Sequence, residues 1–193
     1  MEKIQKYYEN TESEKPRKNV AYFINEIQCD SGNAIELGCG AGNDTVYLIK
    51  NNWNVLAIDR EDVEKRIVKR LNKKELEKFR FQKQNFESLE LEKSNLIVAN
   101  YCLPFCNKNK FKELWDKIER SIIDKGYFVG NFFGTNDSWN ESKTEMIFLS
   151  KKQVTELFKN FEIISFKEIE KDELTGLGKM KHLHIFNVIA RKK

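Results

Sequence analysis

The fold is decided by one stretch, which begins Asn33-Ala34-Ile35-Glu36-Leu37-Gly38-Cys39-Gly40-Ala41-Gly42-Asn43 and ends at Asp59. Its mostly apolar residues 34–37 predict a short strand that runs into a Gly-x-Gly-x-Gly loop. Residues 43–50 predict a helix, and the apolar residues 55–58 predict a second strand that ends in Asp59. A strand, a glycine loop, a helix and a strand in this order predict a β-α-β unit.

The chemistry of this unit favours a ligand that carries adenosine. Glycines at alternate positions let a ligand approach the backbone closely, and the following helix points its free N–H groups at that ligand. Glu36 lies inside an apolar strand, where a carboxylate is costly unless it has a partner such as a ligand amine. Asp59 ends the next strand, where open α/β sheets bind ligands, and its two oxygens can accept both hydroxyls of a ribose. The alternative is a structural turn with Asp59 in solvent.

Two classes of protein use this geometry. A dinucleotide site requires Gly-x-Gly-x-x-Gly, and Asn43 stands where its third glycine would be. Glu36, the glycine loop and Asp59 together resemble the first motifs of class I S-adenosylmethionine (AdoMet) methyltransferases. AdoMet has an ammonium, a sulfonium and a ribose diol but no phosphate, so it suits these carboxylates. An NAD(P)-binding protein is the less favoured reading.

Composition limits the remaining possibilities. A chain of 193 residues, 40% hydrophobic and 33% charged, reads as a single globular domain, 1–193. The N-terminus lacks a secretory signal and no apolar run approaches the roughly 20 residues that span a bilayer, so a cytoplasmic protein without a membrane partner is expected. The four cysteines form no Cys-x-x-Cys pair and there are two histidines, so no metal site is expected. The net charge of +4 comes without a block of like charges, so no nucleic-acid partner is expected.

The rest of the chain alternates helices and strands. Pro16 opens a helix, and Ser150 with Gln153 forms a helix-capping pair. Helices are expected at 17–28, 61–74, 107–123 and 150–160, and a polar loop at 135–144. Strands are expected from 79 to near 84–86 and at 95–101, 126–134, 161–170 and 181–190. This order predicts an α/β, Rossmann-like fold: a mostly parallel seven-stranded sheet with helices on both faces and a C-terminal antiparallel strand pair.

Over nearly its whole length the chain resembles class I methyltransferases, and especially the small TehB-like (tellurite-resistance type) bacterial methyltransferases. The residues that carry the resemblance are Tyr7-Tyr8 followed by Pro16, Glu36 to Asn43, Asp59-Arg60, Asn100-Tyr101-Cys102-Leu103-Pro104-Phe105, Gly126-Tyr127-Phe128, and the ending His184 to Lys192. The resemblance implies AdoMet as cofactor and methyl transfer to a small-molecule acceptor by direct in-line displacement. An AdoMet-binding protein without catalysis is the alternative. A monomer or a homodimer fits equally.

The resemblance also implies roles for individual residues. Gly38 and Gly40 would line the methionine end of AdoMet, Glu36 would reach its amino group, and Asp59 would hold the ribose. Asn85 stands where the family often has an Asp that contacts adenine, with a backbone N–H from Phe86; an ordinary turn Asn is the alternative. The backbone carbonyl of Asn100 would face the methionine amino group, or Asn100 serves a tight turn. The predicted cofactor-binding residues are Glu36, Gly38, Cys39, Gly40, Asn43, Asp59, Arg60, Asn85, Phe86, Asn100 and Tyr101.

The acceptor side is less defined by sequence. Tyr101, Leu103 and Phe105 would lie beside the methyl group, or simply pack in the core. Tyr101 is the one candidate catalytic residue, through positioning, because a general base is needed only if the acceptor must lose a proton. Tyr7 and Tyr8 either cover the site or belong to an exposed amphipathic N-terminus. The more distant candidates for ligand contacts are Arg17, Trp139, His182 and His184.

Overall fold

The computed structural model describes residues 2–142 and 145–193. In this part of the chain, seven strands form one sheet in the order β3-β2-β1-β4-β5-β7-β6. The neighbours from β3 to β5 are parallel, and β7 runs antiparallel to both β5 and β6. The strands are β1 Asn33–Leu37, β2 Asn54–Asp59, β3 Phe79–Lys83, β4 Ser94–Ala99, β5 Ile122–Phe133, β6 Phe161–Leu174 and β7 Met180–Lys192. The predicted fold class is confirmed.

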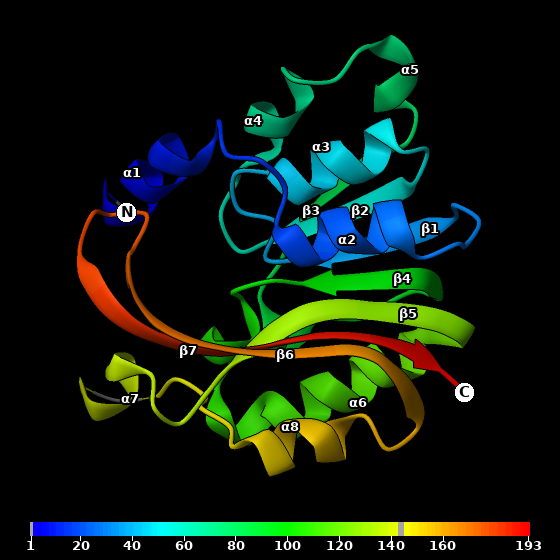
Figure 1. Cartoon of the computed structure of the whole chain (residues 1–193). Helices are drawn as coiled ribbons and strands as arrows, with labels where there is room; N and C mark the ends of the chain where they lie inside the picture. Colours follow the sequence, from blue (N-terminus) through cyan, green and yellow to red (C-terminus); the bar gives the residue numbers. More distant parts are fainter. Residues whose placement is uncertain (1, 143–144) are drawn as a thin grey trace.

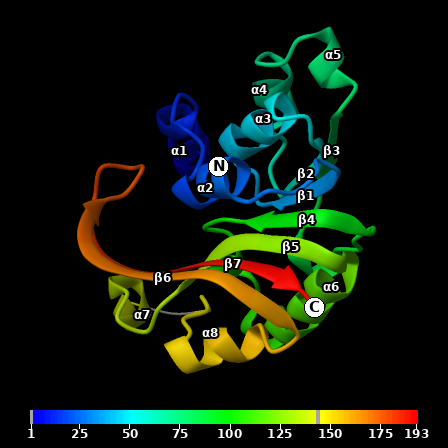
Figure 2. The same cartoon turned by 45° about the vertical axis from the view of Figure 1, so that its right-hand side comes forward.

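Helices cover both faces of the sheet (Figures 1 and 2). One face carries α2 and α3, and the other carries α6 and α8. The helices are α1 Glu2–Thr11, α2 Lys18–Glu26, α3 Asn43–Lys50, α4 Glu64–Val68, α5 Lys73–Leu76, α6 Phe111–Ser121, α7 Ser138–Ser142 and α8 Lys151–Leu157, with 3-10 turns at Phe86–Ser88, Leu103–Phe105 and Lys108–Lys110. Each face has its own apolar core: Trp53 and Phe23 lie in one, and Trp115 and Phe128 lie in the other.

Strand β4 shows why the apolar run at 95–101 predicts a central strand. Leu96 and Val98 pack into the core beneath α2 and α3, whereas Ile97 packs into the core beneath α6 and α8. Successive side chains of a strand point to opposite faces, so a strand covered on both faces needs apolar residues at every position.

Some predicted elements were wrong in detail. The single helix expected at 61–74 is two short helices, because Asn72 begins a new one with a capping box. The Asn72 side chain accepts the backbone N–H of Glu75, and the Glu75 side chain accepts the backbone N–H of Asn72. The loop expected at 135–144 contains α7, and its residues 143–144 lie outside the described residues, as does Met1. The capping pair of Ser150 and Gln153 is confirmed at the start of α8.

Helix α1 meets the tip of the β6–β7 hairpin. The β6–β7 hairpin curves away from the sheet toward α1 (Figure 1). Asn10 Nδ2 donates to the backbone oxygen of Gly176 at 2.9 Å, and a Cβ at Gly176 would lie only 2.7 Å from the Tyr7 ring. Helix α1 is therefore held against the hairpin tip, in a segment for which the sequence predicts no element. Among the described residues, no helix is both long and apolar enough to cross a membrane.

Candidate active site

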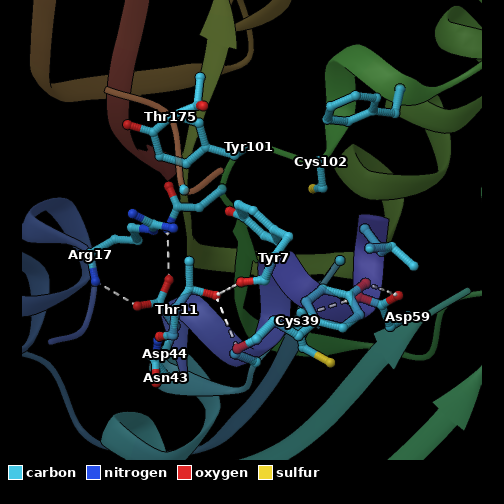
Figure 3. A pocket seen from close by; sticks show the side chains of 18 of the residues that line it. Tyr7, Thr11, Arg17, Cys39, Asn43, Asp44, Asp59, Tyr101, Cys102 and Thr175 are labelled. Carbon is cyan, nitrogen blue, oxygen red and sulfur yellow. Dashed lines mark hydrogen bonds between the residues drawn. The ribbon is translucent and has the colours of Figure 1, made fainter. Parts of the chain in front are cut away.

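A cavity of about 700 Å³ opens where the carboxyl ends of β1, β2 and β4 meet. Helix α1 and the hairpin tip at 173–177 contribute the other side of its wall. Every residue predicted to bind the cofactor lines this one cavity: Glu36, Gly38, Cys39, Gly40, Asn43, Asp59, Arg60, Asn85, Phe86, Asn100 and Tyr101. Figure 3 shows several of them with residues that the sequence analysis did not predict, among them Asp44 and Thr11.

Asp59 ties the glycine loop to helix α1. Its Oδ2 accepts the backbone N–H of Gly40 at 2.8 Å, and its Oδ1 accepts the Tyr8 hydroxyl at 3.2 Å and the backbone N–H of Glu61 at 3.0 Å. Burial and the Asp59 charge raise the pKa of Tyr8, which keeps its hydroxyl protonated and donating. The Tyr8 ring lies over Gly40, where a Cβ would be 3.4 Å from it.

Two buried carboxylates lie together at the methionine end of the predicted site. Glu36 is 4% exposed and accepts a hydrogen bond from the Thr45 hydroxyl. Asp44, in the first turn of α3, accepts the backbone N–H of Arg17 at 2.7 Å and the Asn100 side-chain N–H at 3.0 Å. Burial raises the pKa of both carboxyls, and the Asp44 charge adds to the effect on Glu36. A cationic ligand group would offset this cost.

Asn43 offers a further acceptor to the same end of the cavity. Its Nδ2 donates to the backbone oxygen of Thr11 at 2.7 Å. Its Oδ1 is buried and has no hydrogen-bond partner in the part of the chain that the structure describes. A buried acceptor without a partner is costly, so a ligand N–H at this point would satisfy it.

The turn after β4 is strained and braced. Tyr101 has a φ of +54°, which is unfavourable for a residue with a side chain. Its N–H donates to Asn131 Oδ1 at 2.9 Å, and Asn131 Nδ2 donates to Asn100 Oδ1 at 3.1 Å. Asn19 Nδ2 donates to the same Asn100 oxygen at 2.7 Å. The Arg17 guanidinium lies 4.8 Å from the Tyr101 ring centroid. These bonds fix the strained backbone that places the Tyr101 ring in the cavity wall.

Two cysteines line the cavity: one in the glycine loop and one in the turn after β4. Cys39 and Cys102 are both buried, and burial raises the pKa of both thiols. A Cβ at Gly38 would lie 2.4 Å from Cys102 Cβ, so the loop and the turn after β4 pack directly on each other. A protonated thiol is a poor nucleophile, so covalent catalysis by these groups is disfavoured.

The other end of the cavity is aromatic. Tyr101, Phe105, Phe133 and Trp139 all line it, together with Lys181. For Leu103 the second of its two predicted roles holds, because it is buried in the core beneath α6 and α8. His182 and His184 are not among the lining residues either, because they pair with the carboxylates of β6.

One cluster among the described residues has the spacing of metal ligands. Atoms of Glu168, Glu170 and His184 lie within 4.8 Å of one another. His184 Nδ1 accepts the backbone N–H of Asn136 at 3.1 Å, which leaves the ring proton on Nε2, facing Glu168. A metal at Nε2 would force that proton onto Nδ1, against the Asn136 N–H, so the cluster suits a hydrogen bond better than a metal.

The comparisons with known proteins agree with this geometry. Residues 34–126, which contain the glycine loop, Asp59 and Tyr101, match a family described as a methyltransferase domain. The chain therefore resembles class I methyltransferases: residues 34–126 match the methyltransferase domain, and the sheet has the fold of solved methyltransferases. The domain match and the fold together support AdoMet as its cofactor. No curated protein sequence matches the chain significantly.

Several solved structures share the fold of this chain. TehB from Haemophilus influenzae aligns with a TM-score of 0.75 at 16% identity over 92% of this chain, which spans only 62% of TehB. The N-methyltransferase NodS from Bradyrhizobium japonicum, solved with S-adenosylhomocysteine, aligns with a TM-score of 0.72 at 13% identity over 99% of this chain and 97% of NodS. A Burkholderia thailandensis 1,6-didemethyltoxoflavin N1-methyltransferase was solved with 1,6-didemethyltoxoflavin and S-adenosylhomocysteine. It aligns with a TM-score of 0.70 at 17% identity, over 92% of this chain and 77% of its own. At these identities the likeness shows the fold alone.

Proposed function

We propose that this protein transfers a methyl group from AdoMet to a small-molecule acceptor by direct in-line displacement. The observation that carries the proposal is the shared cavity. The glycine loop, Glu36 and Asp59 lie at one end of it, and the Tyr101 turn lies between them and an aromatic end. AdoMet would supply the electrophilic methyl group on its sulfonium. The small-molecule acceptors in the names of structural neighbours, such as 1,6-didemethyltoxoflavin, support the acceptor class.

The residues at the polar end fit the cofactor. The ammonium of AdoMet would lie among three acceptors on residues that line the cavity: the carboxylates of Glu36 and Asp44 and the Asn43 Oδ1. Asp59 would hold the ribose. The start of the 3-10 turn after β3, at Asn85 and Phe86, would contact adenine, with Arg60 at the mouth.

The chain's part in the reaction would be alignment and exclusion of water. A sulfonium is already a good leaving group, and holding two reactants in line can supply up to roughly 7–11 kcal/mol. Tyr101 is the proposed positioning residue, because its strained backbone is braced by Asn131 and its ring is covered by Arg17. Burial raises the pKa of Tyr101, so its hydroxyl stays protonated and can donate a hydrogen bond.

The same proposal extends to the setting of the enzyme. We propose one domain over 1–193, because the described elements share a single sheet. A cytoplasmic monomer or homodimer without a nucleic-acid partner fits four cysteines that form no disulfide and a net charge of +4 without a basic block.

Thermal unfolding with AdoMet, S-adenosylhomocysteine, NAD and NADP tests the cofactor. A ligand at 100 times its dissociation constant should add about 2.7 kcal/mol of stability. We expect that gain with the two adenosyl ligands only. Asp59→Ala should lose it, whereas Asp62→Ala, a change at an exposed neighbour outside the cavity, should keep it.

Catalysis needs its own readout. Release of S-adenosylhomocysteine with a panel of small-molecule acceptors separates an enzyme from a protein that only binds AdoMet. Stabilisation by NAD instead of AdoMet, or by neither, would overturn the proposal.

A further inference from the structure

The aromatic end of the cavity contains a buried ion pair that the cofactor roles leave unused. The Lys181 side chain is 5% exposed, and its Nζ lies 2.9 Å from Asp137 Oδ2. The same Nζ lies 3.6 Å from the Trp139 ring centroid and 4.2 Å from that of Phe133. Lys181 lines the cavity, and Asp137 does not.

The pair is asymmetric in its hydrogen bonds. Asp137 also accepts the backbone N–H of Trp139 at 3.1 Å and that of His184 at 3.3 Å, so the backbone stabilises its charge. Lys181 has three N–H donors, and Asp137 is its one oxygen partner within the described residues. Burial lowers the pKa of Lys181, because the hydrogen bond and the charge of Asp137 offset only part of the cost of taking the ammonium out of water. An oxygen from a ligand would fill this deficit.

The walls around Lys181 suit a flat ligand. Four aromatic rings form a continuous series. The ring centroids lie 6.2 Å apart between Tyr101 and Phe133, 6.0 Å between Phe133 and Trp139, and 6.5 Å between Trp139 and Phe105. These side chains come from different segments of the chain, and Phe105 is 50% exposed at the end of the series. Offset and edge-on contacts between rings are favourable, so an aromatic ligand would find partners along the whole wall.

We propose that Lys181 and these four rings form the acceptor subsite, and that it takes a planar aromatic acceptor bearing an anionic oxygen that Lys181 binds. This inference rests on the proposed function. A cationic acceptor is disfavoured because the Lys181 ammonium already lies against the faces of Trp139 and Phe133. Glu173, which also lines the cavity, opposes an anion, but it pairs with Lys171 at 3.1 Å.

Three matched probes test the charge preference: 4-hydroxybenzoate, its neutral amide 4-hydroxybenzamide, and the cationic 4-hydroxybenzylamine. Each is titrated calorimetrically into protein saturated with S-adenosylhomocysteine. Wild type should bind the benzoate most tightly. Lys181→Met should lose about tenfold to hundredfold in benzoate affinity and keep its affinity for S-adenosylhomocysteine. Lys179→Met is the matched control, because Lys179 is exposed on the same hairpin and outside the cavity.

The outcomes separate the two proposals. If Lys181→Met does not fold, the double variant Asp137→Asn with Lys181→Met removes both charges and takes its place. Failure of wild type to bind S-adenosylhomocysteine would overturn the proposed function and this inference with it. Binding of S-adenosylhomocysteine without a preference for the benzoate, or an equal loss in Lys179→Met, would overturn this inference alone.

Discussion

Tyr8 and a bound ribose should compete for Asp59, and Tyr8→Phe tests this. A carboxylate accepts roughly four hydrogen bonds. Gly40 N–H, Glu61 N–H and the Tyr8 hydroxyl already donate to Asp59. Two ribose hydroxyls would need two places, so one present donor must leave. The two backbone donors are fixed by the loops, whereas Tyr8 donates from a side chain on α1, so Tyr8 is the donor that the ribose displaces.

The size of the effect follows from the geometry. A hydrogen bond to a charged acceptor contributes about 1.5–3 kcal/mol net. The oxygen–oxygen distance of 3.2 Å between Tyr8 and Asp59 is long for such a bond, which favours the lower end of that range. Tyr8→Phe should therefore destabilise the free protein by about 1.5 kcal/mol and leave the saturated complex unchanged. The affinity for S-adenosylhomocysteine should rise about tenfold.

Calorimetric titration of S-adenosylhomocysteine into wild type, Tyr8→Phe and Tyr7→Phe measures the competition. Tyr7 lies on the same helix and also lines the cavity, but its hydroxyl makes no bond to Asp59, so its variant should bind like wild type. Urea unfolding of the free proteins gives the matching stability difference. Equal or weaker binding by Tyr8→Phe would refute the reasoning, because it would mean that the hydroxyl stays on Asp59 beside the ligand.

The other predictions concern stability. Because burial and Asp44 raise the pKa of Glu36 above its ordinary value of 4.5, the folded protein keeps a proton that the unfolded chain releases; stability should therefore fall as pH rises above about 4.5. Urea unfolding across this range should show a shallower fall for Glu36→Gln, and an unchanged slope would contradict the assignment. Gly38→Ala places a Cβ 2.4 Å from Cys102 Cβ at a φ of +65° and should cost roughly 2–4 kcal/mol in the same measurement. Gly178→Ala, at φ +73° with nothing within 4 Å, should cost only the backbone strain of roughly 1–2 kcal/mol; equal losses would rule out the proposed clash.

The sheet could be predicted because its signals are local. Strands buried on both faces read as unbroken apolar runs, and the glycine loop with Asp59 marks where the first two strands end. Helix boundaries were less predictable. Val63, Ile67 and Leu71 are buried, as their apolar spacing predicts, but the capping box at Asn72 divides the predicted helix. Such a box satisfies backbone groups that a continuous helix would use, and apolar periodicity does not report it.

Helix α1 shows the limit of periodicity in a short polar segment. Ile4, Tyr7 and Tyr8 have helical spacing but give too narrow an apolar face to decide between a cover for the site and a free N-terminus. The structure resolves the choice through distant partners: Asp59 for the Tyr8 hydroxyl and Gly176 for the Tyr7 ring. Neither partner can be inferred from the helix itself.

The two ends of the cavity also differ in how well the sequence predicts their residues. Glu36, the glycine loop and Asp59 of the cofactor end come from one β-α-β unit, so they could be predicted from its motif. Asp44, a carboxylate of the same unit that also lines the cavity, was missed. The acceptor end brings Lys181 of β7 against Asp137, which precedes α7, and Trp139, which lies in α7. In sequence, Lys181 lies between exposed Met180 and half-buried His182, where a lysine ordinarily faces solvent. The packing of α7 and of Phe133 against it buries it. Acceptor specificity built from such long-range contacts can change without disturbing the cofactor motif, because no residue of the glycine loop takes part in it.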